Sequence, residues 1–238
     1  MSEQKNMQNN EIIEAMFKAG AHFGYSKSRR HPSVAPYIFG VKNKTEIIDL
    51  EKTKEFLDKA MAFVSGIAKD GKKILFIGGK SEAKNAIKNG ASIIDMPYVS
   101  GRWIGGTLTN TAEIKKRIAR YEDLTSQKEK GELSKYTKKE RLLIDRLIVN
   151  LEEMFGGIIG MKDVPKAVFV IDPKKEIIAV TEAKKTGIPV IALLNTDCNM
   201  KNVDYPIVAN DSSVSSISFF VDSIVNAYKA GKTPIVNK

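Results

Sequence analysis

The residue types best suited to binding chemistry lie in one short stretch, from Arg102 to Asn110, which contains the chain's single tryptophan, Trp103. An arginine beside an indole ring suits a surface that grips phosphates or stacks on nucleic-acid bases. The structural alternative is a strand-to-helix turn in which Trp103 covers the core and Thr109 or Asn110 caps the next helix. From local chemistry alone we favour the structural alternative, because short motifs often match by chance.

Two clusters of basic residues offer further contacts for phosphate groups. The first lies in the loop 26–32, and its members are Lys27, Arg29 and Arg30. The second follows the Trp103 stretch, and its members are Lys115, Lys116, Arg117 and Arg120. Together with Arg102 the second cluster forms the strongest electrostatic footprint in the chain. For the first cluster a solvated run of charge is the alternative, and we favour phosphate binding modestly.

A phosphate-binding loop is suggested by Gly78-Gly79-Lys80-Ser81, which follows the apolar run 73–77. The spacing does not fit, because Ile74 stands where the motif needs another glycine. The glycine pattern of dinucleotide-binding folds is also missing. We therefore interpret these residues as a feature of the fold and expect no nucleotide cofactor.

Four polar residues, Asp172, Asn195, Asp197 and Asp211, follow predicted strands or precede a predicted helix. They should gather at the carboxyl edge of a sheet, where such residues hold Mg²⁺, act as general bases, or cap helices and turns. We favour capping, because no histidine or lysine stands at a fixed spacing to complete a catalytic set. We expect no catalytic residue, no metal site and no cofactor.

The net charge agrees with a polyanionic partner. The 238 residues include 38 Lys and Arg against 28 Asp and Glu, which gives a formal charge of +10. Nucleic acid is the first candidate partner and an anionic membrane surface the second. No apolar run approaches membrane-spanning length and the polar start does not resemble a targeting segment, so we expect no membrane partner. The single cysteine excludes a disulfide within the chain and fits a reducing compartment.

The elements that must position these residues alternate between strands and helices, which predicts an α/β fold with a three-layer Rossmann/flavodoxin-like parallel sheet. Strands are expected at 73–77, within 91–99, and at 166–171, 188–194 and 204–208. An earlier pair, 36–40 and 45–50, is expected to form a hairpin of strands, and Asp49 to cap the helix 51–68.

The segment 111–156 has a different pattern, with two apolar helical stripes separated by a polar connection. It predicts an inserted antiparallel coiled-coil helical hairpin. We therefore divide the chain into a disordered tail (1–10), a single α/β domain (11–110 and 157–230), the hairpin (111–156) and a loose tail (231–238).

Seven motifs in collinear order resemble the bacterial small-subunit ribosomal protein S-two family. They lie at 22–24, 36–40, 47–53, 102–110, 172–176, 187–192 and 204–207. Each is weak alone, but the ordered set is specific, and the resemblance runs from about Ile12 to about Tyr228. It implies the same fold, with a projecting coiled-coil hairpin, and a structural, non-catalytic role.

The resemblance also implies function. Members bind small-subunit ribosomal RNA between the head and body, support subunit assembly, and help to seat ribosomal protein S-one for translation. The expected partners are this RNA and neighbouring small-subunit proteins including S-one, with no small-molecule substrate, and the expected location is the cytoplasmic ribosome. By position, the residues carried over as RNA-binding are His22, Arg102, Trp103, Thr109 and Asn110.

Three positions depart from the family pattern. Tyr25 stands where the family usually has a histidine, which weakens any paired-histidine metal site. The acid of Asn195-Thr196-Asp197 has moved two places, and Val208-Ala209 replaces a usual Pro-Gly.

Two other classes of protein stay open: a nucleotide-binding enzyme on the same sheet, and an adaptor that docks proteins through the hairpin without RNA.

Overall fold

The computed structural model of the chain describes residues 2–161 and 163–232. Its helices are α1 Ser2–Lys18, α2 Leu50–Lys69, α3 Ser81–Ile93, α4 Thr111–Glu129, α5 Lys138–Phe155, α6 Ile177–Lys185 and α7 Val214–Lys232. Its strands are β1 Phe23–Ser26, β2 Ile38–Lys42, β3 Thr45–Ile48, β4 Ile74–Ile77, β5 Tyr98–Val99, β6 Ala167–Ile171, β7 Val190–Leu194 and β8 Tyr205–Val208. Short 3-10 turns include η1 Lys27–Arg29, η3 Glu132–Lys135 and η4 Gly156–Ile158.

The main sheet contains five strands in the order β5-β4-β6-β7-β8, and every neighbouring pair is parallel. Strands β4, β6 and β7 consist of apolar residues that are buried throughout, as expected when helices cover both faces. Within this sheet β5, the second strand along the chain, lies outside β4, the first, and the later strands follow on the other side of β4. This is the flavodoxin-like strand order. The predicted α/β fold class is confirmed.

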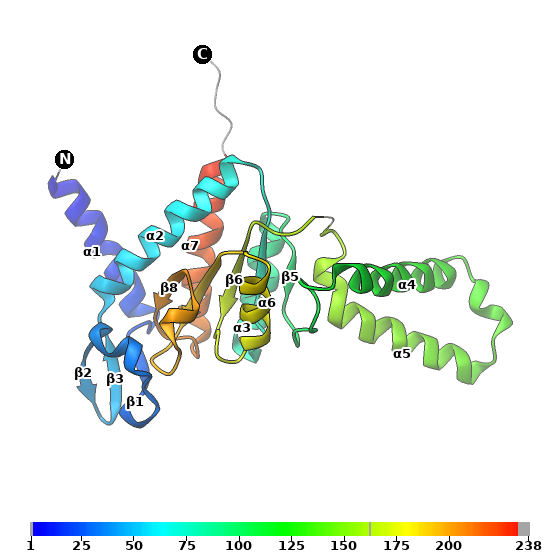
Figure 1. Cartoon of the computed structure of the whole chain (residues 1–238), viewed down its shortest axis with the longest axis horizontal. Helices are drawn as coiled ribbons and strands as arrows, with labels where there is room; N and C mark the ends of the chain where they lie inside the picture. Colours follow the sequence, from blue (N-terminus) through cyan, green and yellow to red (C-terminus); the bar gives the residue numbers. More distant parts are fainter. Residues whose placement is uncertain (1, 162, 233–238) are drawn as a thin grey trace, which may run out of the picture.

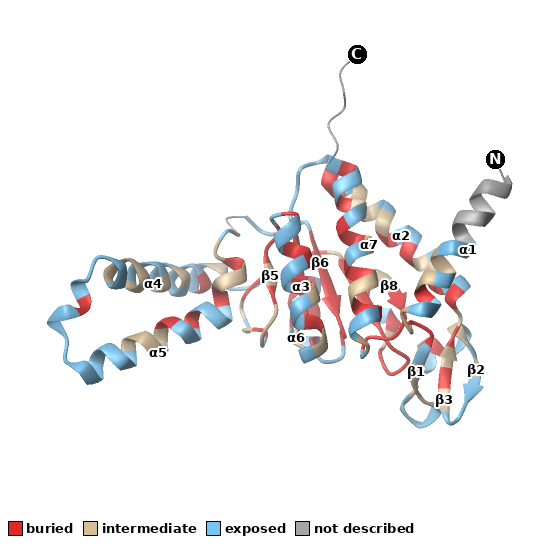
Figure 2. Ribbon diagram, turned by 180° about the vertical axis from the view of Figure 1, so that it is seen from behind, coloured by how far each residue is buried: buried red, intermediate tan, exposed pale blue. Residues whose placement is uncertain are grey.

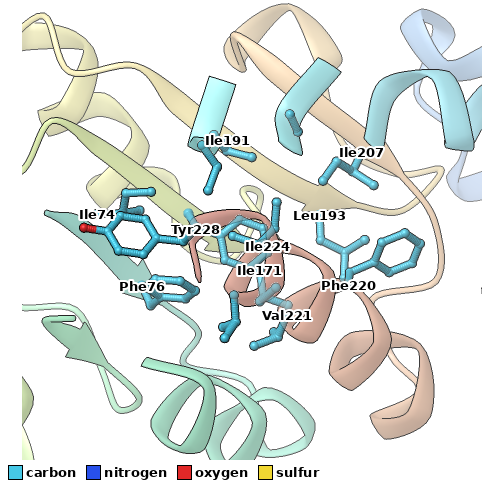
Figure 3. Close-up of a cluster of buried hydrophobic side chains, with 14 of the residues drawn as sticks. Ile74, Phe76, Ile171, Ile191, Leu193, Ile207, Phe220, Val221, Ile224 and Tyr228 are labelled. Atoms are coloured by element: carbon cyan, nitrogen blue, oxygen red, sulfur yellow. The ribbon is translucent and has the colours of Figure 1, made fainter. Parts of the chain in front are cut away.

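Two hydrophobic cores lie on opposite faces of this sheet and complete the three layers. One face packs against α2, α3 and α7. Figure 3 shows this core, with Ile74, Phe76, Ile171, Ile191, Leu193 and Ile207 from the sheet and Phe220, Val221, Ile224 and Tyr228 from α7. The other face packs against α6, the Trp103 stretch and the first turns of the helical hairpin.

A second, antiparallel sheet contains three strands in the order β1-β3-β2. The sequence predicted the β2–β3 pair but assigned no strand to the residues of β1, of which only Ser26 falls in the predicted basic loop. Asp49 caps α2 as predicted, because its Oδ1 accepts hydrogen bonds from the backbone N–H groups of Glu51 at 3.1 Å and Lys52 at 3.4 Å. This small sheet lies far from the helical hairpin in the molecule (Figure 1).

Helices α4 and α5 run side by side and project from the end of the main sheet (Figure 1). The buried residues of α5 lie at its carboxyl end, while much of the remaining hairpin surface is exposed (Figure 2). Lys128 of α4 pairs with Asp145 of α5 at 2.7 Å, and a capping box of Thr137 and Glu140 starts α5. The two helices and their pairing are therefore present, and their packing as a coiled coil stays a prediction.

The strand predicted within 91–99 is present, but it is confined to the two residues after Pro97, and residues 91–93 belong to the end of α3. The apolar run 91–99 did not separate helix from strand because a short run of this kind fits either. Proline also cannot donate to a sheet ladder, so the strand begins after it.

Helix α1 includes residues 2–10, which the sequence assigns to a disordered tail, and α7 includes residues 231–232. Glu3, Gln4, Lys5, Met7 and Gln8 belong to residue types with good helix propensity. Residues 233–238 of the expected loose tail lie outside the described residues. The division of the chain at 11–110, 111–156 and 157–230 stays a proposal.

Two helical glycines give a matched test of the packing between α3 and α7. A Cβ at Gly90 would lie 2.5 Å from Val221 Cγ1, whereas a Cβ at Gly66 on α2 meets nothing within 4 Å. Gly90→Ala should lower the free energy of unfolding by about 1–2 kcal/mol, because overpacking outweighs the gain in helix propensity. Gly66→Ala should raise it by about 0.5–1 kcal/mol. Urea unfolding measures both, and stabilisation by both variants would contradict the close packing at Gly90.

Candidate nucleic-acid interface

The Trp103 stretch is held by one carboxylate, that of Glu182 on α6. The two oxygens of Glu182 accept hydrogen bonds from Trp103 Nε1 at 3.2 Å and from the backbone N–H groups of Gly106 at 2.8 Å and Leu108 at 3.1 Å. They also accept from the backbone N–H of Thr109 at 3.3 Å and its hydroxyl at 3.2 Å. A buried carboxylate thus fixes the path of the chain from strand β5 to helix α4.

The hydrogen bonds also set the charge state of Glu182. Burial raises the pKa of this carboxyl, but the bonds from Gly106, Leu108, Trp103 and Thr109 outweigh it, so the pKa is lowered. The ring of Trp103 is only 5% exposed and lies in the second core. The expected packing of Trp103 on RNA is therefore not supported, because burial leaves no ring face for a base. The structural alternative fits better.

The other residues of this stretch differ in what they offer. Arg102, Thr109 and Asn110 are exposed, although Thr109 also uses its hydroxyl to bind Glu182. Asn110 stands at the N-cap position of α4 but its side chain makes no capping hydrogen bond, so the predicted cap was wrong. Arg102 and Asn110 consequently stay available for a partner.

Arg102 lies in a groove of about 760 Å³ between α3 and the helical hairpin. Lys84 and Lys88, one turn apart on α3, line the same groove, as do Tyr98 and Tyr121. Glu152 and Glu153 of α5 supply negative charge on the opposite wall. We call this hollow the basic groove, because its cations outnumber its carboxylates by three to two.

The second basic cluster, Lys115, Lys116, Arg117 and Arg120, lies at the start of α4, and all four side chains are exposed. Arg117 stands one turn before Tyr121, which lines the basic groove, so the two share a side of α4. Lys115 instead lines a separate hollow of about 40 Å³ together with Met161 and residues 163–165. Lys116 pairs with Glu113 at 3.5 Å. The cluster therefore surrounds the start of α4, with Arg117 on the same side as the groove-lining tyrosine and Lys115 against a different hollow.

The N-terminal basic cluster is partly neutralised by its own fold. Arg30 lies 3.3 Å from the buried carboxylate of Glu46, and Arg29 lies 3.5 Å from Asp197. The Arg29 guanidinium also stacks over the ring of Tyr25, 4.1 Å from its centroid. Lys27 is exposed. Of the three predicted phosphate contacts in this loop, Lys27 is thus the one best placed.

His22 was predicted to contact RNA, but it is buried between two phenylalanine rings. Its ring centroid lies 4.3 Å from that of Phe17 and 4.0 Å from that of Phe23. Burial lowers the pKa of this histidine, which favours the neutral ring. Direct contact between His22 and a phosphate is therefore not supported. Its position favours a role in packing α1 against the small sheet.

The carboxyl edge of the main sheet brings together the polar residues that the sequence placed there. Lys80 Nζ lies 2.7 Å from Asp172 Oδ2 and 2.8 Å from Asp211 Oδ2, and Asn195 Nδ2 donates to Asp211 Oδ1 at 3.1 Å. Burial alone would lower the pKa of Lys80, but Asp211 and Asp172 raise it, so the ammonium stays charged. Asp197 belongs to a neighbouring pair, 2.9 Å from Lys174.

These contacts fill the place where a nucleotide phosphate would bind in a flavodoxin-like sheet. A Cβ at Gly79 would lie 2.5 Å from Glu176 Oε1, so a buried glutamate occupies the mouth of the turn after β4. The Glu176 carboxyl and the two aspartates would disfavour a phosphate at this position. Lys80 cannot offset this effect, because it already pairs with Asp172 and Asp211. The arrangement argues against the nucleotide-binding alternative.

In the described part of the chain, no group of three or more His, Cys, Asp or Glu side chains is arranged to hold a metal ion. In residues 2–161 and 163–232, no helix is both long and apolar enough to cross a membrane. Cys198 is buried, and burial next to Asp172, Asp197 and Asp211 raises the pKa of its thiol.

Sequence reasoning missed two kinds of residue. Lys84 and Lys88 have the four-residue spacing of a helix face, and this spacing was visible in the sequence. The role of Glu182 could not be recognised from neighbouring residues, because its hydrogen-bond partners stand more than 70 positions earlier in the chain.

A flavodoxin-like sheet whose phosphate position is filled by its own side chains, beside a cationic groove, is typical of a binding protein. The family model described as ribosomal protein S2 matches residues 16–231. Among similar proteins, each named small ribosomal subunit protein uS2, that of Nitratiruptor sp. is 43% identical over 92% of this chain and 82% of its own length. That of Chloroflexus aurantiacus is 40% identical over 90% of both chains.

The chain belongs to the ribosomal protein S2 family. Its role is that of a structural ribosomal protein, and it is not an enzyme. The resemblance found from the seven collinear motifs is therefore confirmed.

The Glu182 network gives a pH-dependent test. Glu182→Gln should lower the free energy of unfolding at pH 7 by about 2–4 kcal/mol, because an amide nitrogen cannot accept the bonds that a charged oxygen accepts. The lowered pKa means that the carboxylate stabilises the fold fully above its usual value of 4.5 and loses this effect as pH falls through the folded value. The difference from the unaltered protein should thus shrink below that pH. Urea unfolding at several pH values measures it.

The control is Glu55→Gln on the exposed side of α2, which should change stability by less than about 0.5 kcal/mol. A Glu182→Gln protein as stable as this control at pH 7 would contradict the role given to Glu182.

Proposed function

We propose that this chain is a structural constituent of the small ribosomal subunit and binds small-subunit ribosomal RNA at the basic groove. The observation that supports it best is the convergence of Arg102, Lys84 and Lys88 on one hollow, next to the cationic start of α4. Two tyrosines in the groove, Tyr98 and Tyr121, add aromatic surface of the kind on which ribose and bases pack.

Physical chemistry explains why such a surface would hold RNA. Each lysine or arginine that neutralises a phosphate releases a condensed counterion, and this release supplies affinity that falls as salt rises. Base edges in paired RNA are hidden, so a groove of this kind would recognise shape and phosphate spacing. The site consists of Arg102, Asn110, Arg117 and the two lysines of α3, with Lys115, Lys116 and Arg120 as further phosphate contacts.

The finer assignments rest on the family resemblance. We propose that the chain lies between the head and body of the subunit, supports subunit assembly, and helps to recruit ribosomal protein S-one in translation. We place it in the cytoplasm, on the ribosome. The names of the relatives agree with a small-subunit location.

Charge removal in the groove tests the RNA site. In the triple variant Lys84→Ala, Lys88→Ala and Arg102→Ala, the logarithm of RNA affinity should depend less steeply on the logarithm of salt, by about 0.7–0.9 for each phosphate that is no longer neutralised. Filter binding to deproteinised small-subunit ribosomal RNA, at salt concentrations from about 0.05 to about 0.3 M, measures the slope. The double variant Arg102→Ala and Arg117→Ala should reduce the slope by the same amount for each phosphate left without its cation.

The matched control is Lys69→Ala, at the exposed end of α2, which should leave slope and affinity unchanged. An unchanged slope in the triple variant would remove the groove from the RNA site.

Sedimentation of a native lysate tests the ribosomal location itself. The chain should migrate with small subunits, and treatment with ribonuclease should release it, because RNA provides the surface to which it binds. Migration as a free monomer that ribonuclease does not change would contradict the proposed function. Deleting residues 127–138 tests the adaptor alternative, which predicts the loss of a protein partner with no change in RNA binding.

A further inference from the structure

One end of the small antiparallel sheet gathers three exposed lysines from three separate segments. The strand register places Ser26 opposite Thr45 and Thr45 opposite Lys42, so the end of β1 lies next to the turn between β2 and β3. Lys27 directly follows Ser26, and Lys44 lies in that turn. We call Lys27, Lys42 and Lys44 the sheet tip.

The turn at the sheet tip has a backbone that lysine disfavours. Asn43 has φ 51° and Lys44 has φ 66°, which are the two positive values of a type I′ hairpin turn. Asparagine tolerates this region, and glycine is the usual residue at the second position. At Lys44 the chain therefore places a charged side chain where the backbone would favour glycine.

An exposed aromatic ring accompanies the lysines. Phe39 is 82% exposed, the highest value among the large hydrophobic residues that are exposed in the described chain. It stands at a bulge, because Ile38 pairs with Ile48 while Gly40 pairs with Ile47, so Phe39 is the extra residue. Bulges turn a side chain away from regular pairing. Phe39 lies three residues before Lys42 on β2, a distance of about 10 Å.

The sheet tip has no opposing negative charge on its own hairpin. Residues 38–45 include two lysines and no acid. The next acid, Glu46, is fully buried and faces Arg30 at 3.3 Å. A disfavoured backbone that keeps a lysine, a bulge that exposes a ring, and unopposed positive charge are three separate features of the hairpin formed by β2 and β3.

We propose that the sheet tip and Phe39 form a second RNA contact, in which the lysines meet phosphates and one unpaired base stacks on Phe39. This inference rests on the proposed function and adds a site on the far side of the molecule from the basic groove (Figure 1). An exposed ring and exposed lysines on one hairpin offer the two kinds of contact, base stacking and phosphate neutralisation, that bind single-stranded RNA. An acidic protein partner is the other outcome, and the experiment separates it.

The experiment uses the whole chain and deproteinised small-subunit ribosomal RNA from a bacterium. Lys44→Gly should raise the midpoint of thermal unfolding by about 1–4 °C, because it relieves the turn. The same change should weaken RNA binding about five- to eightfold at roughly 0.1 M salt and flatten the salt slope by about 0.7–0.9. Phe39→Ala should weaken binding by about tenfold without lowering the midpoint.

Asn43→Gly is the matched control, because it places glycine in the same turn without removing charge. It should leave RNA affinity unchanged and the midpoint nearly unchanged, because asparagine already tolerates this backbone. Unchanged RNA affinity in both Lys44→Gly and Phe39→Ala, while the basic-groove variant loses affinity, would overturn the second contact alone. The same holds if these two variants fail only to join small subunits, since that points to a protein partner. A chain that binds no RNA at all overturns the proposed function and the second contact together.

Discussion

The carboxylate of Glu182 is the constraint on which the candidate RNA surface depends. Four consecutive peptide units from Gly106 to Thr109 turn sharply between β5 and α4, and three of their N–H groups donate to this one side chain. Without an anion at that point, the donors would be buried and unpaired. Glu182 thereby fixes the direction of α4, the side on which Arg102 lies, and one wall of the basic groove. A residue that contacts no expected partner determines the geometry of those that do.

The basic residues fall into two groups, according to whether a carboxylate of the chain itself faces them. Arg29, Arg30 and Lys80 face aspartates or glutamates of the chain itself, so their charge holds loops to the sheet. The cations of the groove, the start of α4 and the sheet tip are exposed. Net charge therefore overstates the surface available to a polyanion, and the distinction depends on which cations stand within reach of buried carboxylates.

The sequence allowed the parallel sheet, the paired helices of 111–156 and the cap at Asp49 to be predicted, because each follows from local periodicity or a local hydrogen bond. Strand β1 was not predictable, since its four residues pair with β3 across some twenty positions and are interrupted by a bulge. The burial of Trp103 and His22 could not be predicted from the sequence either. An aromatic residue beside a cation has the same sequence whether its ring is buried or exposed, and only the tertiary fold decides.

The salt-bridged carboxyl edge of the main sheet has a consequence for assembly. In open α/β sheets ligands bind at that edge, but here Lys80 pairs with Asp172 and Asp211, and Glu176 lies against Gly79. The globular part is thus preorganised before it meets any partner. On joining a large ribonucleoprotein it would lose little conformational entropy, so the ordering that accompanies docking would fall on the RNA.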